Sequence, residues 1–201
     1  MTEFEHWESR FSAPDYIFGT APNEFLRTQA RLLPAQGKVL AVADGEGRNG
    51  VWLAEQGLDV LSVDFSPKAL AKAEALAKVR GVVLQMQRVD IITWAWPNAA
   101  FDVVAAIFIQ WATPDQRERI FAGIRQALKP GGLLLLQGYR PEQLVYKTGG
   151  PSQVENLYTR AMLTEAFAGF ADLKIAEHDS VLEEGTRHSG MAALIDLVGR
   201  K

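Results

Sequence analysis

The chain has 201 residues, of which 48% are hydrophobic and 22% are charged, and its formal net charge is −3. These proportions are those of an ordinary soluble globular protein, and the length is enough for one domain with a sizeable core. The acidic balance argues against nucleic acid or an anionic membrane as the partner. The chain contains no cysteine, which excludes disulfides, thiolate metal sites and cysteine nucleophiles.

Residues 1–8 are acidic and lack the apolar core of a secretory signal. No apolar run approaches the roughly 18 residues that a membrane span needs. We therefore expect a cytoplasmic protein whose partner is a small molecule, with no nucleic acid and no membrane, present as a monomer or a weak homodimer.

Four aromatic side chains occur among the charged residues of the N-terminal segment 1–20, namely Trp7, Phe11, Tyr16 and Phe18. Two interpretations remain open, because the rings either pack on the outside of a sheet or lie across a ligand as a lid. Residues 22–33 follow with helical periodicity, and Pro34 ends that helix.

A glycine-containing loop follows a short apolar run, and the rest of the chain is arranged around it. Residues 39–43 predict a buried parallel strand, and Gly45 and Gly47 allow the backbone to turn sharply and to approach a ligand closely. With Gly50 they complete the pattern G-x-G-x-x-G between a strand and a helix. This arrangement is typical of nucleotide-binding α/β folds.

Strands and helices then alternate along the chain. The predicted strands are residues 39–43, 60–63, 82–87, 101–109 and 133–136. Helices connect them, one capped by Ser66 and another by a capping box of Thr113 and Gln116. Such alternation predicts a parallel sheet with helices on both faces, which binds its ligand beyond the carboxyl ends of the strands.

The C-terminal part has a different pattern. A polar and aromatic loop covers residues 139–151, a helix is predicted at 160–167, and strand-like runs cover 171–182 and 191–198. No crossover helix fits between the two runs, so they form an antiparallel pair at the edge of an otherwise parallel sheet. The sequence thus predicts an α/β, Rossmann-like, doubly wound sheet.

Carboxylates gather where the ligand is expected, since Asp44 and Glu46 lie in the loop, Asp64 follows the second strand and Asp90 the third. Beside an anionic pyrophosphate they would be repulsive by on the order of 1 kcal/mol each. S-adenosylmethionine carries a sulfonium, an ammonium group and a ribose, whose hydroxyls suit an acid about 20 residues after the loop. We therefore expect S-adenosylmethionine as the cofactor.

A structural interpretation remains open for each acid. Asp64 is a possible cap of the following helix, although Ser66 is better placed, and Asp90 is a possible cap of a short helix at Ile91. Asp44 and Glu46 are alternatively solvated loop residues.

Other reaction classes lack their residues. The sequence has no H-E-x-x-H, no serine in a nucleophile elbow and no Walker loop, and no metal site is predicted. His6 and His178 are interpreted as surface residues. His188 differs, because it follows Arg187 in a polar turn between glycines, and it is a candidate for contact with a substrate.

Five motifs occur in order: Asp-Gly-Glu-Gly-Arg-Asn at 44–49, Val-Asp-Phe-Ser at 63–66, Val-Asp-Ile at 89–91, Phe-Asp-Val-Val at 101–104 and Leu-Lys-Pro-Gly-Gly at 128–132. Together they resemble the class I S-adenosylmethionine-dependent methyltransferases. Residues 16–23 and Thr-Gly-Gly-Pro at 148–151 resemble its small tellurite-resistance-type branch. The family usually has an acid inside the first strand and a glycine before the loop, where this chain has Ala41 and Ala43.

The resemblance implies a seven-stranded sheet, mostly parallel with an antiparallel last strand, in a single domain of residues 1–201. Residues 1–35 would form an aromatic lid and helix, 36–138 the cofactor-binding core, and 139–201 the substrate loop and antiparallel strand pair. The implied cofactor residues are Asp44, Gly45, Glu46, Gly47 and Asn49 in the loop, Asp64 at the ribose with Phe65 beside it, Asp90 and Ile91 at the adenine, and Ile107 and Phe108 at the sulfonium.

The expected reaction is in-line attack of a small-molecule acceptor on the sulfonium methyl group. A soft sulfur, selenium or tellurium nucleophile needs no general base, and the sequence identifies none. Candidate residues of the acceptor pocket are Tyr16, Phe18, Tyr139, Arg140, Tyr146, Arg187 and His188. Two alternatives stay open, an NAD(P)-dependent oxidoreductase built on the same glycine pattern and a domain that binds S-adenosylmethionine without catalysis.

Overall fold

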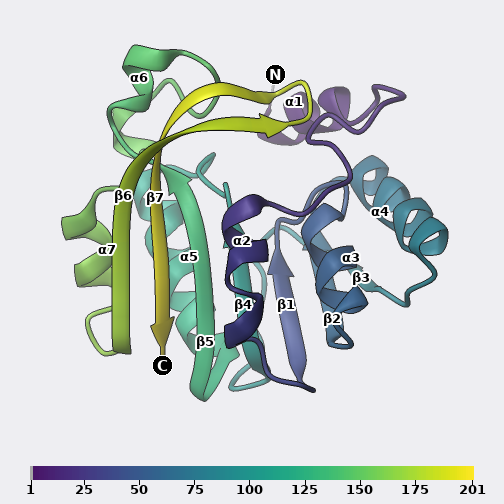
Figure 1. Cartoon of the computed structure of the whole chain (residues 1–201), viewed down its shortest axis with the longest axis horizontal. Coiled ribbons are helices and arrows are strands. Elements are labelled where there is room, and N and C mark those ends of the chain that lie inside the picture. The colour runs from purple at the N-terminus through teal and green to yellow at the C-terminus, as the bar shows by residue number, and fades with distance from the viewer. Residues whose placement is uncertain (1) are drawn as a thin grey trace.

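A computed structural model describes residues 2–201 of the chain (Figure 1). Its strands are β1 (Lys38–Val42), β2 (Asp59–Asp64), β3 (Gln85–Arg88), β4 (Phe101–Ile107), β5 (Leu128–Tyr139), β6 (Ala171–Glu184) and β7 (His188–Arg200). Its helices are α1 (Glu3–Arg10), α2 (Glu24–Thr28), α3 (Arg48–Glu55), α4 (Pro67–Arg80), α5 (Pro114–Ala127), α6 (Gln143–Tyr146) and α7 (Arg160–Ala166), with short 3-10 helices η1 (Ala30–Leu32) and η2 (Val154–Asn156).

The strands form one seven-stranded sheet in the order β3-β2-β1-β4-β5-β7-β6. Strands β1 to β5 run parallel, and β7 is antiparallel to both β5 and β6. The predicted fold, including the antiparallel pair at one edge, is confirmed. Strand β7 forms hydrogen bonds with the edge of β5. No crossover helix is needed between β6 and β7, because antiparallel strands can be joined by a short turn.

Two apolar layers cover the sheet, because successive side chains of a strand point to opposite faces. In β1, Val39 and Ala41 pack with α2, α3 and α4, whereas Leu40 and Val42 pack with α5 and α7 on the other face (Figure 1). All four side chains are buried. The sheet is thereby held from both faces, and its carboxyl edge stays free for a site.

The predicted helix caps are present. Ser66 Oγ accepts a hydrogen bond from Ala69 N (3.1 Å), and Thr113 and Gln116 form the capping box of α5. Several boundaries differ from the sequence interpretation, and β5, predicted at 133–136, extends from Leu128 to Tyr139. β3 begins at Gln85 because residue 82 still closes the C-terminal turn of α4, β4 ends at Ile107 because residue 108 has a φ of +56°, and α2 ends at Thr28 and is followed by η1. Helix α1, started by a Thr2–Glu5 capping box, was not expected.

The β6–β7 hairpin is a long arm that curves over the carboxyl edge of the sheet toward the N-terminal segment (Figure 1). Before Leu194, residues 188–193 of β7 pair only with β6. At the tip, the amides of Thr186 and Arg187 donate to the carbonyl of Ile17 (3.0 and 3.2 Å). A Cβ on Gly185 would lie 2.5 Å from that carbonyl oxygen, so the contact requires glycine.

Among residues 2–201, no helix combines the length and the apolar character that crossing a bilayer requires.

Candidate functional site

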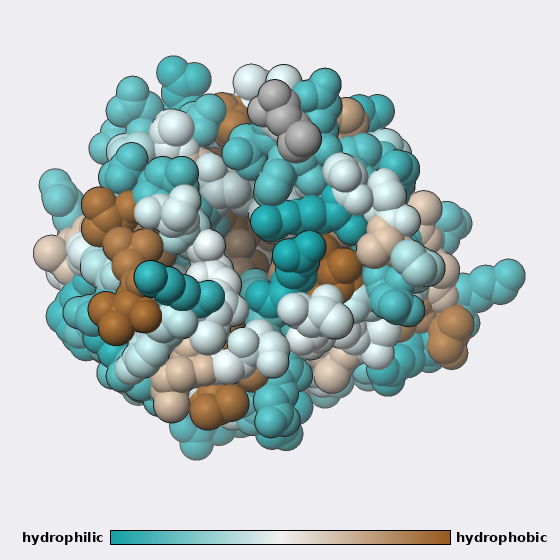
Figure 2. All heavy atoms as spheres, turned by 90° about the horizontal axis from the view of Figure 1, so that it is seen from above, coloured by the Kyte–Doolittle hydropathy of each residue, from teal (hydrophilic) through white to brown (hydrophobic). Residues whose placement is uncertain are grey.

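The carboxyl ends of β1, β2 and β4 open onto a cavity of about 80 Å³. Figure 2 looks down on this edge and shows a mainly hydrophilic surface with a hollow near its centre, where apolar atoms are visible. In open α/β sheets this is the place where ligands bind.

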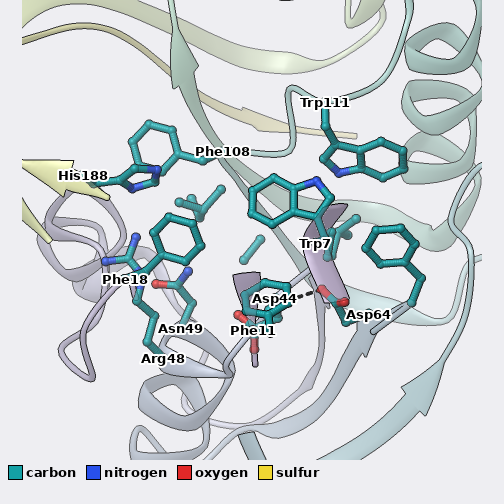
Figure 3. A pocket seen from close by; sticks show the side chains of 16 residues that line it. Trp7, Phe11, Phe18, Asp44, Arg48, Asn49, Asp64, Phe108, Trp111 and His188 are labelled. Carbon is teal, nitrogen blue, oxygen red and sulfur yellow. Dashed lines mark hydrogen bonds between the residues drawn. The ribbon is translucent and has the colours of Figure 1, made fainter. Parts of the chain in front are cut away.

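Asp64, the last residue of β2, lies in the wall of this cavity with 4% of its surface exposed (Figure 3). Its carboxylate oxygens accept hydrogen bonds from the amides of Gly45 and Ser66, both at 2.9 Å. Burial raises the pKa of Asp64 to about 6, although these hydrogen bonds act in the opposite direction. The carboxylate therefore both holds the glycine loop and lines the cavity.

Asp44 joins the loop to its neighbours. Its Oδ2 atom accepts hydrogen bonds from the amide of Gly50 and the hydroxyl of Ser62, both at 3.0 Å, and the residue also lines the cavity. Burial raises the pKa of this carboxyl to about 7, with a further contribution from Asp64. Ala43, directly before it, has a φ of +46°, a left-handed conformation that glycine adopts more readily than alanine.

Gly47 and Glu46 do not line the cavity. Gly47 has a φ of +84°, and a Cβ there would lie 2.5 Å from the Cβ of Ala73, so packing against α4 accounts for this glycine. Glu46 is buried and accepts a hydrogen bond from Lys72 Nζ (2.6 Å). Its direct contact with a ligand stays a prediction.

Asp90 and Ile91 also lie outside the cavity. The exposed Asp90 carboxylate accepts a hydrogen bond from Ile92 N (3.0 Å), as its capping interpretation predicts. Ile91 is buried, and its carbonyl accepts a hydrogen bond from Trp96 Nε1 (3.0 Å). Their adenine contacts stay predictions.

Aromatic rings form most of the opposite wall (Figure 3). The rings of Phe65 and Trp111 are stacked, with centroids 5.6 Å apart and planes 7° apart. The N-terminal segment contributes Trp7, Phe11 and Phe18 to the lining of the cavity, and its role as a lid over a ligand stays a prediction. Tyr16 instead lies against α4, where its hydroxyl donates to the carbonyl of Lys72 (2.9 Å).

A second, wider cleft adjoins the cavity between α1, residues 147–156 and the tip of the β6–β7 arm. The residues that line both spaces are Trp7, Phe18, Phe108, Trp111 and His188. The His188 ring lies 4.5 Å from the rings of both Phe18 and Phe108, between centroids. Tyr139 and Arg187 line the wider cleft. The two spaces therefore share an aromatic wall.

Arg140 and Tyr146 lie outside both spaces. The Tyr146 hydroxyl donates to Asp179 (2.7 Å), and Arg140 forms ion pairs with Asp179 and Glu142. Both side chains therefore already bind acidic residues of the protein itself, and one of these, Asp179, lies on β6. Their roles in acceptor binding stay predictions.

Glu184 and Arg48 form an ion pair at 2.7 Å that no sequence pattern indicated. Arg48 begins α3 and lines the cavity, and Glu184 ends β6 at the base of the hairpin tip. Asn23 is completely buried. Its side-chain Nδ2 donates to the same carboxylate (2.9 Å), and its backbone N–H donates to Asn49 Oδ1 (2.9 Å). Burial opposes ionisation of Glu184, but the neighbouring His188 ring and the charge of Arg48 hold its pKa at about 2.

Several buried polar atoms around the two spaces have no hydrogen-bond partner within residues 2–201: Trp7 Nε1, Arg48 Nη1, Tyr139 OH and His188 Nδ1. Unpaired buried donors are costly, so Trp7 Nε1, Arg48 Nη1 and Tyr139 OH fit a ligand with acceptor groups. The carboxylates of Asp44 and Asp64 fit an ammonium group or hydroxyls, and aromatic rings fit a sulfonium. The residues present thus suit S-adenosylmethionine.

Comparison with known proteins supports this assignment. A protein-family profile described as a methyltransferase domain matches residues 39–132. An uncharacterised methyltransferase of Synechocystis is 32% identical over 111 residues, which cover 54% of this chain and 50% of that protein. The glycine/sarcosine N-methyltransferase of Halorhodospira halochloris is 33% identical over 106 residues, which cover 49% and 38%. The chain thus spans about half or less of the length of these relatives.

Solved structures share the fold over nearly the whole chain. A protein studied for the conversion of a disulfide into a thioacetal group during echinomycin biosynthesis superposes with a TM-score of 0.77 at 17% identity, covering 99% of this chain and 91% of that one. A methyltransferase of Methanosarcina mazei gives 0.71 at 18% identity, covering 90% and 98%. Residues 39–132, just under half of the chain, are therefore similar to a methyltransferase domain, and the chain shares its fold with solved structures that include a methyltransferase.

Proposed function

We propose that the protein transfers a methyl group from S-adenosylmethionine to a small-molecule acceptor. The observation that carries this proposal is the aromatic wall shared by the acidic cavity and the wider cleft. A cofactor in the first space and an acceptor in the second would meet at that wall. The cofactor supplies a methyl group already activated on a sulfonium, so the protein has mainly to bind and align.

The residues divide into two groups under this proposal. Asp64 binds the ribose hydroxyls, Asp44 lies at the ammonium end, and the rings of Trp7, Phe18 and Phe108 surround the sulfonium. We propose that residues 1–201 act as one domain, in which 36–138 hold the cofactor and the flanking segments close the acceptor cleft. The cytoplasmic location and the monomer or weak homodimer remain predictions.

We further propose a soft acceptor atom, namely sulfur, selenium or tellurium, and membership of the tellurite-resistance-type branch. The aromatic wall supports this choice, because polarizable sulfur makes favourable contacts with aromatic rings. The echinomycin structure, whose title names a reaction at a disulfide, is compatible with it. At 17% identity, the similarity to that structure shows a shared fold only.

Calorimetric titration with S-adenosylmethionine, S-adenosylhomocysteine and NAD(P) tests the cofactor, and mass spectrometry of an acceptor panel tests the transfer. We expect both S-adenosyl compounds to bind and a methylated product to form. Binding of NAD(P) alone would favour the oxidoreductase alternative. Tight cofactor binding with no product from any acceptor would favour a binding domain without catalysis.

The substitution Asp64→Ala should weaken cofactor binding by roughly 1.5–3 kcal/mol, as expected for loss of a charge-assisted hydrogen bond. Thr159→Ala is the matched control, since it removes the cap of α7 outside both spaces. It should lower the melting temperature and leave the calorimetric affinity nearly unchanged. An unchanged affinity in Asp64→Ala would remove Asp64 from the site.

A further inference from the structure

His188 is the imidazole in the wall shared by the cavity and the wider cleft, among the residues that the structure describes. The ring is 8% exposed and is held between Phe18 and Phe108, with Tyr139 at 5.8 Å between ring centroids. The other members of the shared wall are Phe and Trp side chains, which do not accept protons. His188 is therefore placed where an acceptor atom would meet the methyl group.

The two ring nitrogens of His188 have different surroundings. Nδ1 lies 3.6 Å from Glu184 Oε2 and is sealed from solvent. Nε2 has no hydrogen-bond partner within residues 2–201 and is not sealed. Glu184 is fixed by its ion pair with Arg48, so its carboxylate is available to the Nδ1 proton. This arrangement favours the tautomer with the proton on Nδ1 and a free electron pair on Nε2.

We propose that His188 Nε2 is the general base of the methyl transfer, oriented by Glu184, and that the acceptor enters as a neutral thiol. The inference rests on the proposed function. In the step, Nε2 takes the proton of the acceptor, and the electron pair left on the acceptor sulfur forms the new bond to the methyl carbon. The pair of the broken carbon–sulfur bond stays on the former sulfonium sulfur, which becomes a neutral thioether. The imidazolium then returns its proton to solvent.

The charged groups around the ring are compatible with a neutral resting imidazole. They are Glu184 on β6, Arg48 on α3 and Arg187 directly before it in the chain, with Arg10, His6, Lys147, Glu3 and Glu155 around the wider cleft and Asp44 and Asp64 around the cavity. Burial lowers the pKa of His188, and Arg48 acts in the same direction, whereas Glu184 raises it. Burial also raises the pKa of Tyr139, which therefore stays a neutral hydroxyl.

Nitrogen-15 NMR of the free protein tests this arrangement without any acceptor. The chain has three histidines, so the His188 signals can be assigned by comparison with His188→Asn. At pH 7 we expect a neutral ring with the proton on Nδ1, and a mixture of tautomers in Glu184→Gln. A ring that is protonated on both nitrogens, or a proton on Nε2 in the natural protein, would overturn the proposal.

Two thiol acceptors separate base catalysis from a structural role. Benzyl mercaptan is largely neutral at pH 7, whereas 4-nitrobenzenethiol is largely ionised and needs no base. We expect His188→Asn to lower kcat with benzyl mercaptan by about 10²–10⁴-fold and with 4-nitrobenzenethiol by less than about 3-fold. The control His178→Asn, which also removes a hydrogen-bonded imidazole but lies outside both spaces, should affect both acceptors slightly and equally.

Equal losses with the two thiols, or no loss, would overturn the base role. Methylation of neither thiol by a protein that binds S-adenosylmethionine would overturn the acceptor class and the base role with it. Absence of S-adenosylmethionine binding in calorimetry would instead overturn the proposed function. The failures of the two proposals are therefore distinguishable.

Discussion

Ala43 occupies a backbone conformation that its side chain disfavours. Its φ of +46° lies in the left-handed region, which costs roughly 1–2 kcal/mol for a residue with a Cβ. The glycine loop begins directly after it, so the turn out of β1 imposes the conformation. The sequence indicates the departure from glycine, but the strain is visible only in the structure.

Replacing Ala43 by glycine should therefore raise the free energy of unfolding by about 0.5–1 kcal/mol, since part of the gain is lost to the greater freedom of glycine in the unfolded chain. Urea denaturation measures this change in the free energy of unfolding. Ala41→Gly is the matched control inside β1, where the residue is buried, and it should destabilise the protein. A destabilised Ala43→Gly variant would contradict the strain argument.

Asp44 gives the free protein a pH dependence of known sign. Its pKa of about 7 lies above the ordinary value of 3.8, so the folded state binds more protons between these pH values. The contribution of Asp44 to stability therefore falls as pH rises from about 4 to 7, by at most about 1.4 kcal/mol per pH unit. The lowered pKa of His188 acts in the opposite direction.

Comparing Asp44→Asn with the natural protein cancels the His188 contribution. The variant keeps an oxygen that can accept from Gly50 and Ser62 but carries no charge. Its stability relative to the natural protein should increase between pH 5 and pH 8 in thermal unfolding of the free protein. The same difference at both pH values would show that Asp44 is not protonated near neutrality.

At the scale of elements, a buried ion pair joins the β6–β7 arm to the start of α3, directly after the glycine loop. The side chains of Arg48 and Glu184 are only 7% and 9% exposed. The strands of the arm were predictable from their apolar runs, and their antiparallel pairing from the short connection. The pairing of Arg48 with Glu184 was not, because it joins residues 136 positions apart and depends on the curvature of the arm.

A double-mutant cycle with Arg48→Met and Glu184→Leu measures this contact. Each single substitution leaves a buried charge without its partner and should cost about 3–5 kcal/mol of unfolding free energy, whereas the double variant should cost less than the sum. The exposed pair Arg27–Glu24, with side chains 58% and 63% exposed, is the control and should couple by less than about 1 kcal/mol. Additive effects at Arg48 and Glu184 would contradict the buried-pair interpretation.

At the scale of the whole molecule, segments from both ends of the sequence complete a site whose base is the sheet. The alternation of strands and helices was enough to predict the sheet and the position of Gly45, Asp44 and Asp64 at its carboxyl edge. It was not enough for Glu46, whose side chain is turned toward Lys72 by the packing of α4. Which loop acids face a ligand depends on that packing and not on their spacing.

Trp7 is a residue of the N-terminal segment that lines both the cavity and the wider cleft. Because this ring lines both spaces, Trp7→Ala should weaken S-adenosylmethionine binding by about 10-fold and speed its dissociation. Calorimetry and stopped-flow displacement measure the two effects. Trp94→Ala, a large truncation next to Trp96 and outside both spaces, should lower stability and leave affinity within about twofold. Equal affinity losses in the two variants would indicate a general loss of folding.

The contact between the hairpin tip and Ile17 also constrains the order in which the protein folds. The amides of Thr186 and Arg187 bind a carbonyl that is synthesised nearly the whole chain earlier. Contacts of such large sequence separation form late, after the loop-closure entropy has been overcome by the sheet. Nascent chains that have not yet emerged to residue 188 thus have the glycine loop but lack the His188 ring of the shared aromatic wall.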